Sequence, residues 1–303
     1  MNDVDLEALR DKYRGCMLGL AVGDALGAPL EFIDRAEIAR RYGEVREMIG
    51  GGWLDTAPGE YTDDTQMALA IARSVANLGR VDPADIAAHF VRWMESMPKD
   101  IGNTTLQSLG YLAAGVSWNV AGARTMAQRG DSAAGNGSIM RAAPLALLCR
   151  NDREALIRQS LDISLITHAD PRACWACVAL NQAIVNLLEG SDDVIAAASD
   201  VQQPQVRETV ATAAVAKRDD VLSGGFVLHT LGASLWALLN HDGFEEVVVA
   251  AVNLGGDADS TGAVAGALAG ARYGASAIPE RWLAILQGRQ ELTDLADRLL
   301  ELS

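Results

Sequence analysis

Apolar residues recur along most of the chain at the three- and four-residue spacing of amphipathic helices. Between residues 64 and 78, Met67, Ile71, Val75 and Leu78 form one stripe, and Gly79 follows as a stop. The same pattern covers 84–97, 104–115, 121–129, 138–149, 153–166, 171–189, 205–217, 227–240, 243–252, 260–273, 279–287 and 291–301. Because no series of alternating polar and apolar residues indicates strands, the pattern predicts an all-α protein.

The predicted helices follow one another without an obvious division. No long linker rich in Ser, Pro or Gly and no low-complexity tract interrupts the 303 residues. This length is sufficient for a sizeable buried core. We therefore expect one compact, orthogonal multi-helix domain over residues 1–303.

Two of the predicted helices carry a glycine at every fourth position. Each glycine inside a helix costs about 1 kcal/mol relative to alanine, so the repeats need a compensating gain. A glycine on every turn clears one face and lets another backbone approach closely. We therefore expect helices 15–27 and 260–273 to be central, closely packed, and candidates for packing on each other. The glycines are Gly15, Gly19, Gly23 and Gly27 in one stretch and Gly262, Gly266, Gly270 and Gly274 in the other.

Composition narrows the classes of function. Half of the residues are hydrophobic and 5% are aromatic, while the formal net charge is −15. No run of Lys and Arg could neutralise a nucleic-acid backbone, so general nucleic-acid binding is excluded. The N-terminal stretch is charged throughout and lacks the apolar core of a signal peptide. No uninterrupted apolar segment approaches about 18 residues, so we expect no membrane span. We also expect the protein to be cytoplasmic and monomeric.

The four cysteines, Cys16, Cys149, Cys174 and Cys177, all lie in apolar helical patterns. A chain of this length does not need disulfides, and we interpret them as reduced, buried thiols. Cys174 and Cys177 form a CxxC, but no second pair and no histidines stand at zinc spacing.

Oxygen-bearing side chains cluster where one helix should begin. Residues 60–67 read EYTDDTQM, which places Thr62, Asp63 and Asp64 in a row. One interpretation is a helix cap, with Asp63 as N-cap and Gln66 three positions on, as in a capping box. The other interpretation is a cation site.

A second helix start, far along the chain, repeats this chemistry. Asp257, Asp259 and Ser260 stand directly before the small-residue helix at 260–273. A helix N-terminus supports only about half a positive charge, so one cap cannot use this many carboxylates. Four carboxylates brought together would repel one another unless divalent cations neutralised them. All-oxygen ligands without His or Cys favour Mg²⁺ or Mn²⁺ over zinc.

Seven segments, in order along nearly the whole chain, resemble the ADP-ribosylglycohydrolase family, and within it the bacterial enzymes of the dinitrogenase reductase-activating type. The TDD and GGDADS signatures are the most specific of them. The segments are GCMLGLAVGDALGAPLEF (15–32), MIGGGWL (48–54), YTDDTQMA (61–68), PKDIGNTT (98–105), AGNGSIMRAAPLAL (134–147), ITHADPRA (166–173) and NLGGDADSTGAVAGALAGARYG (253–274).

The resemblance implies an all-α domain with two Mg²⁺ or Mn²⁺ ions in a cleft. It implies hydrolysis of the glycosidic bond between ADP-ribose and an acceptor, most often the guanidinium of arginine on a protein, although an ADP-ribosylated metabolite is also a possible substrate. In the family's mechanism the ions hold the ribose hydroxyls and a water. Thr261 is a rival to Ser260 as the hydroxyl ligand. The implied metal ligands are Thr62, Asp63, Asp64, Asp257, Asp259 and Ser260.

The resemblance also assigns acid–base groups. Asp100 matches an acid that the family places beside the reacting ribose, and its other interpretation is an N-cap for the helix after Asn103. Glu31 matches a gating or acid–base group near the metals, and its other interpretation is a solvated loop carboxylate. Asp100 is the first candidate for the acid–base group that acts at the ribose, and Glu31 is the second.

The remaining matches suggest a path for the substrate. The turn Gly135-Asn136-Gly137-Ser138 opens the predicted helix bearing Met140 and Arg141, and its backbone N–H groups suit a pyrophosphate. Arg141 is a candidate partner for phosphate or for a neighbouring carboxylate. The family pattern makes His168 face ribose or phosphate, and Phe226 a ring that stacks on the adenosine side. His229 departs from the family, and Trp53 is either a cleft residue or a surface aromatic.

Two other functions fit parts of this pattern. A two-metal phosphohydrolase also uses paired cations, but it would leave the DIG, GNGS and TH segments unexplained. The second is a non-catalytic ADP-ribose binder or structural relative. Such a protein would not need the complete set of metal ligands that this sequence carries. The sequence favours the metal-dependent ADP-ribosyl hydrolase.

Overall fold

The computed structural model describes residues 3–303, and within them every regular element is a helix. The all-α prediction is confirmed. The α-helices are α1 (Asp3–Gly27), α2 (Arg35–Tyr42), α3 (Asp63–Leu78), α4 (Pro83–Glu95), α5 (Asn103–Ala113), α6 (Trp118–Arg129), α7 (Ala143–Leu148), α8 (Arg153–Leu165), α9 (Pro171–Leu188), α10 (Pro204–Ala213), α11 (Val227–Asn240), α12 (Phe244–Val252), α13 (Ala258–Tyr273), α14 (Glu280–Leu283) and α15 (Arg289–Leu302). Short 3₁₀ turns are η1 (Ala28–Leu30), η2 (Gly130–Ala133), η3 (Ala196–Ala198), η4 (Arg218–Asp220) and η5 (Ala275–Ala277).

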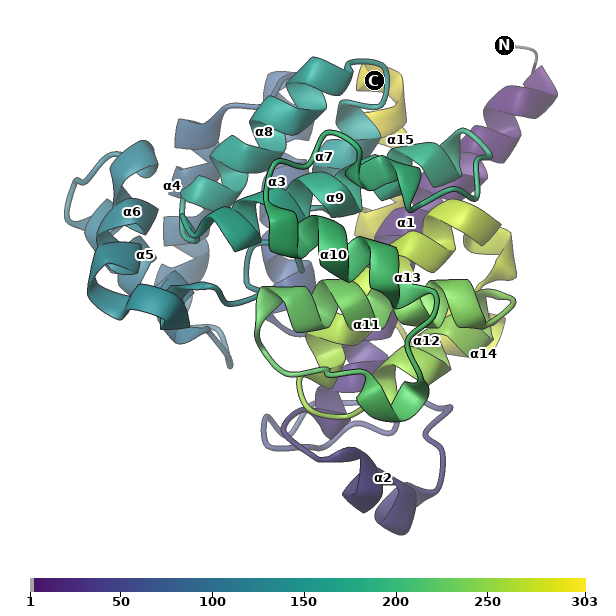
Figure 1. The fold of residues 1–303 in the computed structure, drawn as a ribbon. Coiled ribbons are helices and arrows are strands. Elements are labelled where there is room, and N and C mark those ends of the chain that lie inside the picture. The colour runs from purple at the N-terminus through teal and green to yellow at the C-terminus, as the bar shows by residue number, and fades with distance from the viewer. Residues whose placement is uncertain (1–2) are drawn as a thin grey trace.

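The two glycine-striped helices, α1 and α13, pack on each other through the centre of the molecule (Figure 1). A Cβ added to Gly19 would overlap the carbonyl oxygen of Gly266, and one added to Gly23 would overlap that of Gly262. Because the residue numbers of the partners in α13 fall as those of the glycines in α1 rise, the two helices run antiparallel. The prediction that the stripes mark a central, closely packed pair is confirmed.

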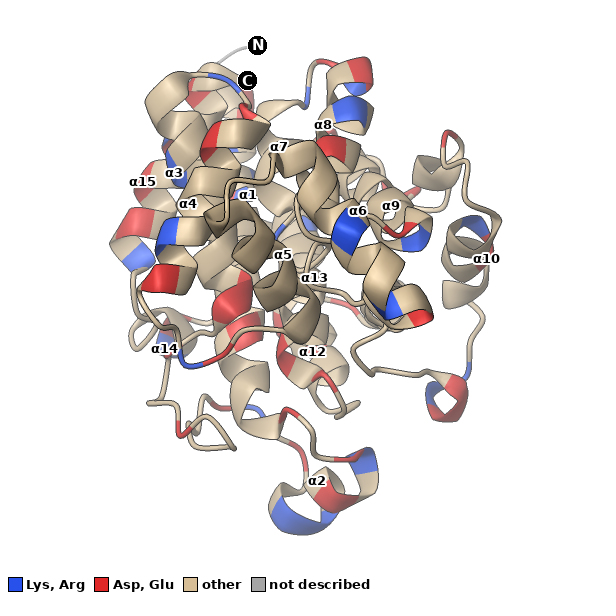
Figure 2. Cartoon of the chain, turned by 90° about the vertical axis from the view of Figure 1, so that its left-hand side faces the viewer, with Lys and Arg blue, Asp and Glu red and all other residues tan. Residues whose placement is uncertain are grey.

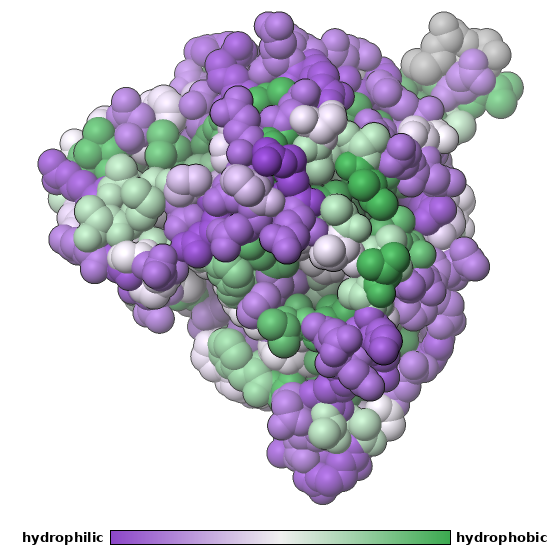
Figure 3. All heavy atoms as spheres, in the orientation of Figure 1, coloured by the Kyte–Doolittle hydropathy of each residue, from purple (hydrophilic) through white to green (hydrophobic). Residues whose placement is uncertain are grey.

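Other helices surround this pair. Helices α9, α11 and α12 pack against α13, and α15 and α3 pack against α1. The core between them consists mainly of Ala, Val, Leu and Ile, with Trp282 and Phe244 among its few large buried side chains. Hydrophilic residues dominate the face of the molecule drawn in Figure 3. Across residues 3–303, no helix combines the length and apolar character that crossing a bilayer would need.

Some predicted elements differ from the observed ones. The predicted helix 138–149 begins only at Ala143, so Met140 and Arg141 lie in a buried turn before it, and that prediction was wrong. Pro144 in the first turn favours this later start. Helix α2 was missed because Ile38 is its one buried residue, which leaves no apolar period to recognise.

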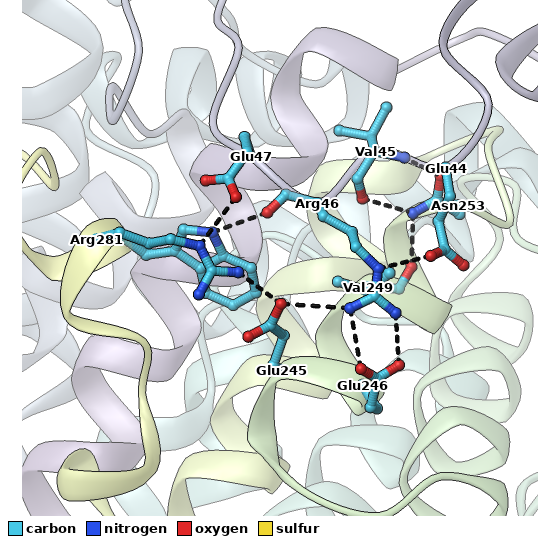
Figure 4. A network of polar contacts seen from close by, with 10 residues as sticks. Glu44, Val45, Arg46, Glu47, Glu245, Glu246, Val249, Asn253 and Arg281 are labelled. Carbon is cyan, nitrogen blue, oxygen red and sulfur yellow. Dashed lines mark hydrogen bonds and ion pairs between the residues drawn. The ribbon is translucent and has the colours of Figure 1, made fainter.

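Polar contacts fasten the segment after α2 to the start of α12 and the loop beyond it (Figure 4). The side-chain amide of Asn253 accepts from the Val45 N–H at 2.8 Å and donates to the Val45 carbonyl at 2.9 Å. Arg46 forms an ion pair with Glu246 at 2.7 Å, and Arg281 joins Glu47 at 2.9 Å. Asn253 also precedes the acidic GGDADS stretch, so the network links the 44–47 segment to one side of the candidate site.

Candidate active site and metal centre

A cavity of about 420 Å³ opens where several helix ends and loops meet. In Figure 2, acidic segments from separate elements gather below α5, in the same region. The N-termini of α3 and α13 and the segments before α5 and after η1 each contribute carboxylates to its wall. These carboxylates are Glu31, Asp63, Asp64, Asp100, Asp257 and Asp259.

A carboxylate from α1 caps the N-terminus of α3. Asp24 is fully buried and accepts from the backbone N–H groups of Thr62 and Thr65, at 2.9 and 3.0 Å, and from both hydroxyls. Thr62 occupies the N-cap position and makes no side-chain cap of its own. The capping box with Asp63 as N-cap was therefore wrong, because Asp24 satisfies these N–H groups from another helix. Asp63 and Asp64 are free to face the cavity.

Asp24 was missed by the sequence analysis, although a signal was present. It is a lone acid within the apolar, glycine-striped segment LGLAVGDALGAPL. A carboxylate on such a helix must be buried, and a buried carboxylate needs donors. Burial raises its pKa to about 6, while the hydrogen bonds from Thr65 and Thr62 oppose that shift.

A tight turn presents the acids of α13. Gly255 and Gly256 both have positive φ, 71° and 69°, and a Cβ on Gly256 would lie 2.6 Å from the carbonyl oxygen of Ser223. The Asp257 N–H donates to the same carbonyl oxygen at 2.7 Å. Glycine is required here by both space and conformation. The turn places Asp257 at the N-cap and Asp259 in the first turn of α13.

Burial and mutual repulsion dominate the electrostatics of this site. Burial raises the pKa of Asp63 well above its ordinary value, and Asp100 and Asp24 raise it further. The pKa of Asp64 is raised by burial and then by Asp24, and that of Asp259 by burial and then by Asp257. Carboxyl groups that are held together despite burial and mutual repulsion indicate a cation-binding site.

The donor set fits divalent metal. Oxygen atoms of Glu31, Asp257 and Asp259 lie within 4.8 Å of one another, the one metal-sized group of His, Cys, Asp or Glu found in residues 3–303. Asp64 Oδ1 and Thr261 Oγ1 are buried and, within the described chain, have no hydrogen-bond partner. Carboxylate and hydroxyl oxygens are ligands for hard cations such as Mg²⁺ and Mn²⁺.

The two candidate acid–base residues both reach the cavity. Glu31 lies directly after η1, and burial raises its pKa to about 8 against the opposing hydrogen bond from Trp53. Asp100 is not the N-cap of α5, because Gly102 holds that position. Burial raises the pKa of Asp100 as well. Glu31 is also part of the metal-sized group, which the sequence analysis did not place it in.

The glycine turn and His168 form a second part of the wall. Gly135, Asn136, Gly137 and His168 line the cavity, and a Cβ on Gly137 would lie 2.8 Å from the His168 ring. The Asn136 N–H already donates to the Gly225 carbonyl at 3.1 Å. Burial lowers the pKa of His168 to about 3, so its imidazole is neutral at pH 7 and can form hydrogen bonds without carrying charge.

Three predicted substrate contacts do not line the cavity. Arg141 is fully buried, stacks 4.4 Å from the centre of the Phe90 ring and donates to Thr167 Oγ1 at 2.7 Å. The hydroxyl of Ser138 accepts from that of Ser164 at 2.9 Å. Phe226 packs against His229, with ring centroids 5.1 Å apart, and only its neighbour Gly225 reaches the cavity wall.

A different arginine lies at the wall. Arg129 ends α6 and lines the cavity, and its buried Nε has no hydrogen-bond partner among residues 3–303. Nothing around Arg129 in the sequence marks it, whereas Arg141 follows the glycine turn and was chosen for that proximity. Proximity in sequence misled here because the turn directs Arg141 into the core.

Of the two candidate hydroxyl ligands, Ser260 lines the cavity. Thr261 is fully buried and does not line the cavity. All four cysteines are free and buried, and Cys174 and Cys177 contact the His168 carbonyl and the Ser138 hydroxyl.

Comparison with known proteins supports the geometric interpretation. The sequence profile described as ADP-ribosylglycohydrolase matches residues 5–303. The chain belongs to the ADP-ribosylglycohydrolase family. A solved structure titled as an ADP-ribosylglycohydrolase-related protein complex superimposes with a TM-score of 0.85 and 37% identity, over 98% of this chain and 99% of that chain. The family resemblance found in the sequence and the helical fold it implied are both confirmed.

Two relatives within the ADP-ribosylglycohydrolase family are similar over nearly the whole chain. The ADP-ribosylarginine hydrolase Tri1 of Serratia proteamaculans is 37% identical over 95% of this chain and 79% of its own length. The ADP-ribosyl-dinitrogen reductase glycohydrolase of Rhodospirillum rubrum is 37% identical over 98% of both chains.

Proposed function

We propose that this protein is a metal-dependent hydrolase that cleaves the glycosidic bond between ADP-ribose and the guanidinium of an ADP-ribosylated arginine on a protein. The observation that carries the proposal is the convergence of six carboxylates from separate segments on one cavity. The names of the two relatives, an ADP-ribosylarginine hydrolase and an ADP-ribosyl-dinitrogen reductase glycohydrolase, support the same bond and acceptor.

The proposed cofactor is a pair of Mg²⁺ or Mn²⁺ ions. Such ions supply a template for the ribose hydroxyls and lower the pKa of a bound water. The Glu31 carboxylate lies close enough to Asp257 and Asp259 to share an ion with them. Ser260 is preferred over Thr261 because it lines the cavity. The proposed ligands are five residues that line the cavity, Asp63, Asp64, Asp257, Asp259 and Ser260, together with Thr62, which does not line it and whose hydroxyl donates to Asp64 Oδ2 at 3.2 Å.

The reaction breaks the bond between the anomeric carbon and the guanidinium nitrogen and adds the oxygen of water to that carbon. Asp100, which lines the cavity, takes one proton from the water, and the leaving nitrogen gains one proton, giving ADP-ribose and arginine. Positive charge develops on the ribose as the bond breaks, and the surrounding carboxylates stabilise it. Glu31, with its pKa raised to about 8, is the second acid–base candidate.

The rest of the cavity wall suits the diphosphate and ribose. The Gly135–Gly137 turn lets a ligand approach the backbone closely, and Arg129 offers a cation whose Nε lacks a partner in the described residues. His168 remains neutral and can form a hydrogen bond to a ribose or phosphate oxygen. We propose Arg129 in place of Arg141 as the arginine that contacts phosphate.

The test is incubation with proteins or peptides ADP-ribosylated on arginine, with and without chelator, and detection of free ADP-ribose by mass spectrometry. We expect release of intact ADP-ribose that the chelator abolishes and Mg²⁺ or Mn²⁺ restores. Asp63→Ala should lose both metal binding and turnover, whereas Asp100→Asn should bind metal and turn over slowly. Release of inorganic phosphate would instead indicate a phosphohydrolase. Tight ADP-ribose binding without hydrolysis of any conjugate would indicate a non-catalytic binder.

A further inference from the structure

Two exposed aromatic rings, those of Phe32 and Trp53, stand together on the wall of the acidic cavity. Their centroids are 5.5 Å apart with 38° between the ring planes. Phe32 is 69% exposed and Trp53 is 52% exposed, so burial in a core does not account for either ring. Exposed aromatic rings grouped at a cavity are typical of a binding surface.

Phe32 has an unfavourable backbone conformation. Its φ of +61° lies in the left-handed region that bulky residues avoid. The Phe32 N–H donates to the Gly256 carbonyl at 2.6 Å, and the Gly256 N–H donates to the Ile33 carbonyl at 2.8 Å. The turn that presents Asp257 therefore also fixes Phe32. Strain maintained by surrounding structure is characteristic of functional sites.

Trp53 is held by one hydrogen bond and by the loop that carries it. Its Nε1 donates to Glu31 Oε2 at 2.5 Å, which ties the indole to the cavity carboxylate. The preceding glycines, 50 to 52, all have positive φ, and a Cβ on Gly52 would lie 2.8 Å from Cα of Pro29. The segment before this loop is fastened to α12 by the Asn253 and Arg46 contacts (Figure 4). The ring is therefore presented by an anchored loop.

The chemistry around the pair favours a planar cation. Aromatic faces attract guanidinium groups, and the Glu31 carboxyl group beside the rings offers oxygen acceptors for guanidinium N–H groups. A diphosphate needs donors, and Arg129 and the Gly135–Gly137 turn offer them elsewhere in the cavity. We propose that Phe32 and Trp53 form the acceptor subsite, where their faces bind the arginine guanidinium of the conjugate. This proposal rests on the proposed function, since it names what binds on the acceptor side of that reaction.

The first test compares variants on ADP-ribosyl-agmatine, whose acceptor is a guanidinium without a peptide. Trp53→Ala and Phe32→Ala should each raise KM by about three- to tenfold, the range expected for losing a cation–π contact. Trp53→Phe keeps an aromatic face but loses the bond to Glu31, so it should retain most of the affinity. Tyr42→Ala, at an exposed aromatic in α2 outside the cavity, is the matched control and should leave KM unchanged.

A second measurement separates acceptor binding from adenosine binding. Inhibition by free ADP-ribose, which lacks the guanidinium, should be the same in Trp53→Ala as in the native protein. If ADP-ribose affinity falls in parallel with that for the conjugate, the rings contact adenine and the acceptor subsite is refuted. An unchanged KM for ADP-ribosyl-agmatine in both alanine variants would refute it as well.

The proposal can also be tested without turnover. Agmatine alone should quench tryptophan fluorescence of the native protein, and the quench should diminish in Trp53→Phe. Should the native protein hydrolyse no conjugate, the proposed function fails on that result, while the agmatine titration still reports on the subsite. Absence of any difference in quench between the two proteins would count against the subsite even if hydrolysis is observed.

Discussion

Asp24 joins two helices through one buried carboxylate. It comes from α1, yet its oxygens satisfy the first N–H groups of α3, the helix that carries Asp63 and Asp64. A charged acceptor at a helix N-terminus is favourable, because the aligned peptide dipoles place positive charge there. The residue therefore sets where the cavity carboxylates of α3 stand relative to α1.

Asp24→Asn should destabilise the Mg²⁺-saturated protein by about 2 kcal/mol or more, since the amide leaves a backbone N–H of Thr62 or Thr65 facing an NH₂ group. Urea denaturation measures the change. The control is Asp34→Asn, which alters the exposed N-cap of α2. It should change stability by less than about 0.5 kcal/mol, because Asn caps as well as Asp. Equal losses in the two variants would show that Asp24 is an ordinary cap.

Arg129→Ala should raise KM for the conjugate about tenfold or more by removing a charge-assisted contact to phosphate. Free ADP-ribose should bind more weakly by a similar factor, because it retains the diphosphate. Arg124→Ala on the same helix is the control, since Arg124 stacks on Tyr111 and does not line the cavity. Steady-state kinetics and product inhibition check both expectations. An unaltered KM in Arg129→Ala would remove this residue from the proposed site.

At the residue scale, the sequence was sufficient to group residues whose motifs are local, while their binding of metal stays a prediction. Asp63, Asp64, Asp257 and Asp259 stand in short motifs at two helix starts, and all four line the cavity. Arg129 could not be found this way, because only tertiary packing brings the end of α6 to the wall.

At the scale of elements, the α1 and α13 pair decides the fold. Periodic glycines revealed it from sequence because a costly residue repeated on every turn has few physical explanations. The residues at which helices begin and end were harder to predict from the sequence. The apolar pattern of residues 138–142 predicts a helix, but these residues form a turn. Contacts with distant residues hold their buried side chains, such as that of Ser138 with Ser164, and no local pattern encodes such contacts.

Gly19→Ala should destabilise the protein by about 3 kcal/mol or more, because the new methyl overlaps the Gly266 carbonyl and forces the central helices apart. Gly110→Ala is the matched control, as its Cβ would meet nothing within 4 Å in α5. It should stabilise the protein by up to about 1 kcal/mol through helix propensity. Thermal and urea unfolding check both signs. Stabilisation by Gly19→Ala would contradict the close packing of α1 on α13.

At the scale of the whole molecule, the organisation of the domain comes first, and we then expect the acidic cavity to link folding to metal and to pH. The organisation as one domain over residues 1–303 stays a prediction, supported by the central pair and its contacts with helices from both halves of the chain. The monomeric state and the cytoplasmic location likewise stay predictions from sequence.

Metal-free protein should lose stability as pH rises from about 4.5 to about 8. Burial raises the folded-state pKa of Asp24 to about 6 and of Glu31 to about 8, so the folded state holds protons that the unfolded chain releases. Their stabilising contribution is present below the unfolded pKa and is lost as pH passes the folded pKa. Mg²⁺ should therefore raise Tm more at pH 8 than at pH 5, by scanning fluorimetry. A Tm increment independent of pH would contradict this linkage.

Acids from the starts of α3 and α13 are proposed to bind divalent cations together, and anomalous diffraction from crystals soaked in Mn²⁺ is the decisive measurement. We expect anomalous peaks inside the cavity, within bonding distance of oxygens from Asp63 or Asp64 and from Asp257 or Asp259. A cavity without peaks at saturating Mn²⁺, or peaks that contact only one of the two helix starts, would contradict it.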